Sequence, residues 1–169
     1  MNSFQLDKSK AKASVLYVAA NVQSLDRHKL YKIMYFAEQD HLVNYGKPIT
    51  GDTYIKMTYG PVPSYIKDKV ERAIDEDGSV SSNGTLVIAN DYPDMDELSE
   101  SDVESLDKAI LENKDKSFSQ LTKESHKEAW TKAVMAGNID VFEIAKEAKA
   151  DDGILDYIKN SIESNSSFS

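Results

Sequence analysis

Apolar residues recur at helical spacing through much of this 169-residue chain. Over residues 7–22, alanine, valine and leucine recur every three or four positions, which predicts a helix. The same pattern predicts a second helix over residues 26–44. Gly46 would end it, because glycine readily adopts the left-handed conformation that follows a helix end. Ser64 fits the N-cap of a third helix over residues 65–74.

The second half of the chain is also mostly helical in pattern. Ser99 and Asp102 fit the N-cap and the third helical position of a capping box, so a fourth helix is expected to begin there. Three shorter helices are predicted over residues 118–130, 141–148 and 153–162. We expect residues 161–169, which are mostly small and polar, to form a disordered tail.

β-structure is indicated at two places. Residues 52–58 alternate in the manner of a strand. Asn83-Gly84 separates two short apolar runs and signals a hairpin, which the first segment could join as a third strand. The Gly- and Pro-rich residues 59–63 predict a turn. The expected fold class is α+β and predominantly α-helical: a single compact domain, residues 1–160, with a small antiparallel β-hairpin or three-stranded sheet.

The composition narrows the classes of function. Hydrophobic residues make up 40% of the chain and charged residues 29%, which is typical of a soluble domain. Cysteine is absent, which excludes disulfides and thiolate chemistry and suits a reducing compartment. No apolar run approaches the roughly 18–20 residues that span a bilayer, and the N-terminus lacks a signal core. We therefore expect a cytoplasmic protein without a membrane partner.

The net charge of −9 is unevenly placed, since residues 71–112 hold 13 acidic and two basic residues. Such a segment argues against broad phosphate binding, so nucleic acid is not the expected partner. It would favour a basic protein surface. The candidate carboxylates for such a contact are Glu97, Glu100, Asp102 and Glu104. The alternative is an acidic surface that is only solvated.

No familiar catalytic motif appears in the chain. It lacks a phosphate-binding glycine loop, HExxH and GxSxG, so we expect neither an enzyme nor a cofactor. Glu38 and His41 share a helix face as in half of a di-iron site, but a second Glu-x-x-His is missing, so no metal is expected. His126 and Trp130 are four residues apart on one predicted helix, either as a functional pair or as a packed tryptophan beside a hydrogen-bonded histidine.

The most distinctive stretch is YGKPITGDTYIKMTYGPVPS, residues 45–64. It contains three of the seven glycines and three of the four prolines. Glycine permits backbone conformations that other residues avoid, and proline fixes them. The stretch therefore either builds a corner of the fold or forms a surface that a partner binds.

Residues 29–64 resemble the Panacea domain, a family that includes SocA-like antitoxins and phage-associated GepA-type proteins. A later segment, SHKEAWTKA at residues 125–133, is similar to the family's histidine and tryptophan segment, with Ala129 where proline is expected. The positions that match the motifs are Tyr35, Phe36, His41, Tyr45, Gly46, Pro48, Gly51, Asp52, Tyr54, Tyr59, Gly60, Pro61, Val62, His126 and Trp130.

The resemblance implies an antitoxin that blocks a cognate protein toxin by direct binding, with the toxin encoded by the adjacent gene. Toxins of this family are diverse and include translation inhibitors. One branch delivers its toxin to a bacterial protease, so an adaptor role is an alternative, as is a DNA-binding regulator. A domain that serves many partners needs a fixed frame, so we expect the motif to be mainly scaffold. The oligomeric state is left open.

Overall fold

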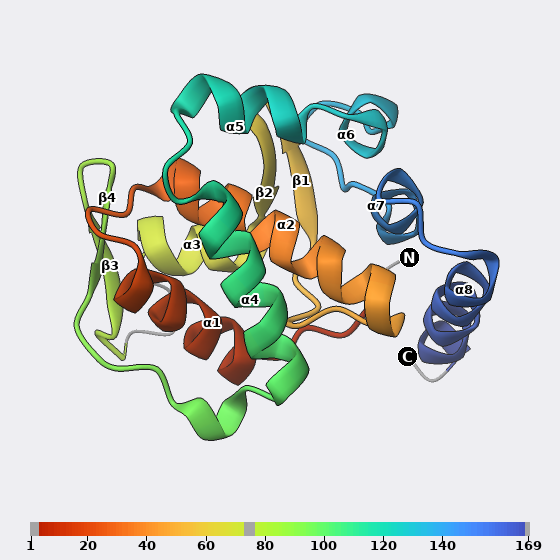
Figure 1. The fold of residues 1–169 in the computed structure, drawn as a ribbon, viewed down its shortest axis with the longest axis horizontal. Helices are drawn as coiled ribbons and strands as arrows, with labels where there is room; N and C mark the ends of the chain where they lie inside the picture. Colours follow the sequence, from red (N-terminus) through yellow and green to blue (C-terminus); the bar gives the residue numbers. More distant parts are fainter. Residues whose placement is uncertain (1–3, 73–76, 168–169) are drawn as a thin grey trace.

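The structure is a computed structural model that describes residues 4–72 and 77–167. Eight α-helices, one short 3-10 helix and two β-hairpins form this part of the chain (Figure 1). In chain order the elements are α1 (Lys8–Asn21), α2 (Arg27–Tyr45), β1 (Tyr54–Met57), β2 (Gly60–Pro63), α3 (Ser64–Arg72), β3 (Val80–Asn83), β4 (Leu86–Ala89), η1 (Met95–Glu97), α4 (Glu100–Asn113), α5 (Phe118–Ser125), α6 (Glu128–Lys132), α7 (Val141–Glu147) and α8 (Asp152–Ser167).

Helix α2 is the centre of the fold (Figure 1). It packs against α4 most extensively, and also against α1, β2, α5, α7 and α8. One hydrophobic core joins α2 to α1, α3 and α4, and includes the fully buried Leu16, Leu30 and Leu106. A second joins α2 to α6, α7 and α8 around Leu42 and Ile158. Because both hydrophobic cores pack against α2, the position of this helix determines where the flanking helices lie.

The predicted starts of the helices are confirmed by their caps. Asp7 accepts a hydrogen bond from the Lys10 amide, and Asp26 accepts one from the Lys29 amide. Ser99 and Asp102 form the predicted capping box at the start of α4. These side chains satisfy amide groups that have no partner within the helix. The observed elements also confirm the predicted fold class, which is α+β and mainly helical.

The β-structure consists of two separate antiparallel hairpins, not of one hairpin or a three-stranded sheet. Strand β1 pairs with Gly60–Pro63, which the sequence analysis assigned to a turn. Pro61 and Pro63 are compatible with a strand here because proline is tolerated at a sheet edge, and in a two-stranded sheet both strands are edges. The turn lies at residues 58–59. The predicted Asn83-Gly84 hairpin is confirmed as β3–β4.

Two further boundaries differ from the sequence analysis. The single helix predicted over residues 118–130 is two helices, because the chain leaves helical geometry at His126. Ser125 is buried there and its hydroxyl donates to the Thr122 carbonyl oxygen, a local bond that competes with helix continuation. Helix α8 extends to Ser167, into the predicted tail, and Ile162 is buried against the second core. Within residues 4–72 and 77–167, no helix is long and apolar enough to cross a membrane.

Candidate partner-binding site

The glycines of the 45–64 motif hold the chain in conformations that only glycine accepts easily. Gly46 has φ 73° and ends α2, with its amide donating to the Leu42 carbonyl oxygen. Gly51 has φ 76°, and a Cβ there would collide with the carbonyl oxygen of Gln5. The left-handed conformation and the close backbone approach both exclude larger residues. These two positions are therefore structural.

Asp52 joins the motif to helix α3. Its two carboxylate oxygens accept hydrogen bonds from the amides of Tyr65, at 2.9 Å, and Ile66, at 3.0 Å. Burial raises the pKa of Asp52, although these amide bonds oppose the shift. Asp52 therefore satisfies the first amides of α3 from a position 13 residues before Tyr65. The cap that the sequence analysis assigned to Ser64 is supplied by Asp52.

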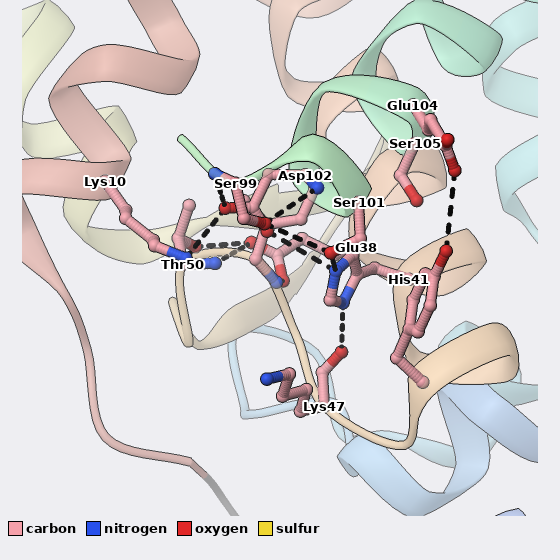
Figure 2. A network of polar contacts seen from close by, with 12 residues as sticks. Lys10, Glu38, His41, Lys47, Thr50, Ser99, Ser101, Asp102, Glu104 and Ser105 are labelled. Atoms are coloured by element: carbon pink, nitrogen blue, oxygen red, sulfur yellow. Dashed lines mark hydrogen bonds and ion pairs between the residues drawn. The ribbon is translucent and has the colours of Figure 1, made fainter. Parts of the chain in front are cut away.

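Glu38 fixes the loop that precedes Gly51. It is fully enclosed on α2 and accepts hydrogen bonds from the Ile49 amide at 3.0 Å, the Thr50 amide at 2.8 Å and the Thr50 hydroxyl (Figure 2). Burial raises the pKa of Glu38 to about 7, while the hydrogen bonds from Thr50 and Ile49 act in the opposite direction. Three donors converging on one carboxylate make this loop rigid.

His41 connects the same loop to α4 (Figure 2). Its Nδ1 lies 2.6 Å from the carbonyl oxygen of Lys47, so Nδ1 carries the donated proton. Its Nε2 lies 3.0 Å from the Ser101 hydroxyl and 3.3 Å from Asp102. Burial lowers the pKa of His41, which favours the neutral ring. His41 is thus a structural link between two helices and a loop.

Asp102 is a correction to the set of carboxylates predicted to face a partner. Its side chain is buried, pairs with Lys10 Nζ at 2.7 Å and accepts the Ser99 amide (Figure 2). Burial opposes ionisation, but the bonds from Lys10 and Ser99 outweigh it and hold the pKa of Asp102 below its usual value. Glu97, Glu100 and Glu104 remain exposed.

The aromatic residues of the motif divide into a buried and an exposed group. Tyr35 and Tyr54 are buried with their rings in edge contact at 5.4 Å, and Tyr35 also meets the half-buried Phe36. The Tyr35 hydroxyl donates to Glu147 on α7. Tyr45 is exposed at the end of α2, with its hydroxyl 3.4 Å from Glu104. Pro48 lies half-buried in the loop that His41 and Glu38 hold.

His126 and Trp130 do meet, although they do not share a helix. Their rings stack at 3.8 Å with an interplanar angle of 8°. Trp130 Nε1 donates to the carbonyl oxygen of Met57, and Lys56 Nζ lies 4.1 Å from the centroid of its ring. The pair therefore packs on one side of the β1–β2 hairpin and fixes α6 against β1, while His126 Nε2 is buried without a hydrogen-bond partner.

An open cleft lies beside the hairpin turn. Tyr59 in the turn is 57% exposed and Phe118 at the start of α5 is 51% exposed, and their rings meet edge to face at 5.2 Å. Phe118 also stacks on His28 of α2 at 3.9 Å. These residues and the exposed Met57 line a cleft of about 530 Å³. We call it the Tyr59 cleft.

The floor of the Tyr59 cleft includes a buried lysine. Lys32 of α2 is 1% exposed and its Nζ donates to the carbonyl oxygen of Pro61 at 2.9 Å. Gly60, with φ 117°, leaves room for it, because a Cβ at Gly60 would strike the Lys32 side chain and the Ser125 hydroxyl. Val62 is buried and also contributes to the cleft. Gly60 and Val62 therefore line the cleft together with Tyr59, and Pro61 between them supplies the acceptor for Lys32.

Sequence reasoning missed Phe118, His28 and the role of Lys32. Phe118 was noted only as the start of a helix, and 59 residues separate it from Tyr59 along the chain. A tertiary contact at that separation leaves no local pattern. Among the described residues, no group of three or more His, Asp and Glu side chains is arranged to hold a metal ion.

Residues 30–131 match the model of the family described as "Antitoxin SocA-like, Panacea domain". The match covers more than half of the chain, so the protein belongs to this family of antitoxins. Neither a curated protein nor a solved structure matches the chain significantly. The resemblance identified from residues 29–64 is confirmed, and the matched region extends through Trp130.

Proposed function

We propose that this protein neutralises a cognate protein toxin, encoded by the adjacent gene, by binding it directly and covering its working surface. Membership of the antitoxin family supports the general role. The observation that carries the mechanism is the Tyr59 cleft, where the half-exposed rings of Tyr59 and Phe118 meet edge to face beside an open cavity. Aromatic side chains at a concave surface are characteristic of the residues that dominate binding energy at interfaces.

The buried polar residues of the frame that carries the cleft support binding by a preformed surface. Glu38, His41, Asp52 and Asp102 are engaged in holding loops and helices, and each has its partners inside the protein. A rigid frame lowers the entropy cost of binding, because the contact surface is already in place before the partner arrives. In this proposal the target is a translation-inhibiting toxin, and the protein holds it in a stable complex.

Co-expression with the neighbouring gene tests the proposal. Expression of the neighbouring gene alone should stop cell growth. Cells that express both genes should grow, and the two proteins should co-purify as a complex. If growth returns while the neighbour's protein product disappears, and that product reappears in a protease-deficient host, the protein is an adaptor for a protease. If the neighbour is harmless and nothing co-purifies, the antitoxin proposal fails, and binding to the upstream DNA becomes the next test.

Variants of exposed aromatic residues inside and outside the Tyr59 cleft test whether the toxin binds at the cleft. The double variant Tyr59→Ala, Phe118→Ala should bind the toxin at least ~10-fold more weakly, because truncating an interface aromatic commonly costs more than about 1 kcal/mol. Tyr92→Ala is the control, since Tyr92 is 87% exposed and lies on the segment before η1. Equal affinities for the two variants would contradict the assignment of the cleft.

A further inference from the structure

The Tyr59 cleft combines apolar walls with an unusual set of charges. Tyr59, Phe118 and Met57 supply the exposed apolar surface. The charged side chains along it are three cations and two carboxylates: Arg27, Lys32, Lys67, Asp26 and Glu71. The protein as a whole has a net charge of −9, so a cleft with more basic than acidic side chains is a local exception. A surface of this kind selects for an anionic group beside an apolar one.

Both carboxylates of the cleft already have partners. Asp26 caps α2 by accepting the Lys29 amide at 2.7 Å. Glu71 accepts the Tyr31 hydroxyl at 2.6 Å and lies 3.3 Å from Arg27 and 3.8 Å from Lys67. One carboxylate therefore serves two cations on the rim. Both carboxylates that line the cleft therefore bind groups other than Lys32.

Lys32 is the cation that lacks a counter-ion. Within residues 4–72 and 77–167, no carboxylate lies within ion-pair distance of its Nζ, and the carbonyl oxygen of Pro61 is its hydrogen-bond acceptor. Burial lowers the pKa of Lys32 to about 7. A lysine ammonium can donate three hydrogen bonds, so its capacity is only partly used. Burial without a counter-ion disfavours the ammonium form, and an anion brought into the cleft would favour it again.

We propose that the Tyr59 cleft receives a toxin segment that carries an acidic side chain next to an apolar one. The apolar side chain lies against Tyr59 and Phe118, and the carboxylate faces Lys32 with Arg27 and Lys67 at the rim. This inference rests on the proposed antitoxin function and names the chemistry of its partner. An anion in the cleft supplies the missing counter-charge at a site where low polarity strengthens the attraction.

Pairing with a carboxylate has a measurable proton signature. In the free protein at pH 8, most Lys32 side chains are uncharged, because burial lowers the pKa to about 7. An opposite charge favours the protonated form and raises that pKa again. The complex should therefore take up about one proton on binding at pH 8, through the linkage between binding and protonation. A Lys32 with a purely structural role would give no such uptake.

The experiment is calorimetric titration of the wild-type protein with the purified product of the adjacent gene, at pH 8 in two buffers of different ionisation enthalpy. The difference in heat between the buffers gives the number of protons taken up. Lys32→Met should abolish the uptake and weaken binding by roughly tenfold or more. Lys29→Met is the matched control on the same helix, because the Lys29 ammonium donates to the Lys114 carbonyl oxygen outside the cleft.

The outcomes separate this inference from the proposed function. Failure of the wild-type protein to bind the neighbour contradicts the proposed function itself. Binding without proton uptake, or equal affinities for Lys32→Met and Lys29→Met, overturns the acidic-segment inference and leaves the antitoxin intact. A change in the self-association of Lys32→Met alone would show that the cleft meets a second copy, which also overturns it. If Lys32→Met does not fold, the proton uptake of the wild-type protein on binding is measured between pH 6 and 9 instead. The absence of proton uptake across that range would refute the acidic-segment inference.

Discussion

Replacing Asp52 by alanine should show how strongly the motif depends on one side chain. The Asp52 carboxylate is the acceptor for two amides at the start of α3, those of Tyr65 and Ile66. Loss of an N-cap costs about 1–2 kcal/mol. Ile66 is fully buried, so its amide would find no water in place of Asp52, which adds about 1–3 kcal/mol. We therefore expect Asp52→Ala to lower the free energy of unfolding by about 2–5 kcal/mol.

Urea denaturation followed by far-UV circular dichroism measures this loss. Asp52→Asn should fall between wild type and alanine, because asparagine keeps one oxygen acceptor but turns an amide donor toward the other N–H group. Ser117→Ala is the matched control: Ser117 caps α5 at an exposed position, accepts the Gln120 amide, and should cost about 1 kcal/mol. If Asp52→Ala cost no more than Ser117→Ala, the assignment of Asp52 as the cap that fixes α3 would be refuted.

Three further changes test other parts of the account by the same denaturation measurement. Gly51→Ala should cost more than about 1 kcal/mol, because φ is 76° and a Cβ would meet the Gln5 carbonyl oxygen, whereas Gly84→Ala has open space and carries only the φ penalty; equal losses would contradict the close approach. Asp102→Ala should cost about 2 kcal/mol, because it removes the acceptor for the Ser99 amide at the start of α4 and the carboxylate that pairs with Lys10; a loss below about 1 kcal/mol would argue against the network. Burial lowers the pKa of His28 to about 4, so between pH 6.5 and 4 the unfolded chain binds a proton that the folded protein does not. The free energy of unfolding should therefore be highest above pH 6.5 and fall toward pH 4. His28→Gln should remove this part of the pH dependence, and an unchanged pH dependence would contradict the assignment.

The helices could be predicted from the sequence because their signals are local. Asp7, Asp26 and Ser99 each precede an apolar repeat, and each caps the helix that was expected. Gly46 ended α2 as predicted for the same reason. A cap needs only residues within one turn of the helix start, so a single sequence contains the whole signal.

The segments that were misread depend on tertiary contacts. Residues 60–63 resemble a turn because of their glycine and prolines, but their pairing with β1 in a two-stranded sheet makes prolines acceptable. Asp102 resembles its exposed acidic neighbours Glu100 and Glu104 in sequence, and only the approach of Lys10 from α1 and His41 from α2 shows that it is internal. Asp52 caps a helix from across the β1–β2 hairpin, which no local pattern indicates.

The candidate site was only half visible in the sequence for the same reason. Tyr59 belongs to a recognisable motif, but its exposure and its contact with Phe118 appear only once α5 lies beside the hairpin turn (Figure 1). Gly46, Gly51 and Asp52 of the motif hold the frame, whereas Tyr45 and Tyr59 are exposed. This division fits a domain in which one scaffold presents a surface that can differ between partners.

Hydrogen–deuterium exchange of the protein, alone and in complex with the product of the adjacent gene, tests the central claim most directly. We predict that binding slows amide exchange at residues 56–62 and 117–122, which border the Tyr59 cleft, and leaves the acidic start of α4 unchanged. Protection confined to residues 97–104, or no protection anywhere in a complex that neutralises the toxin, would contradict the assignment of the Tyr59 cleft as the surface that binds the toxin.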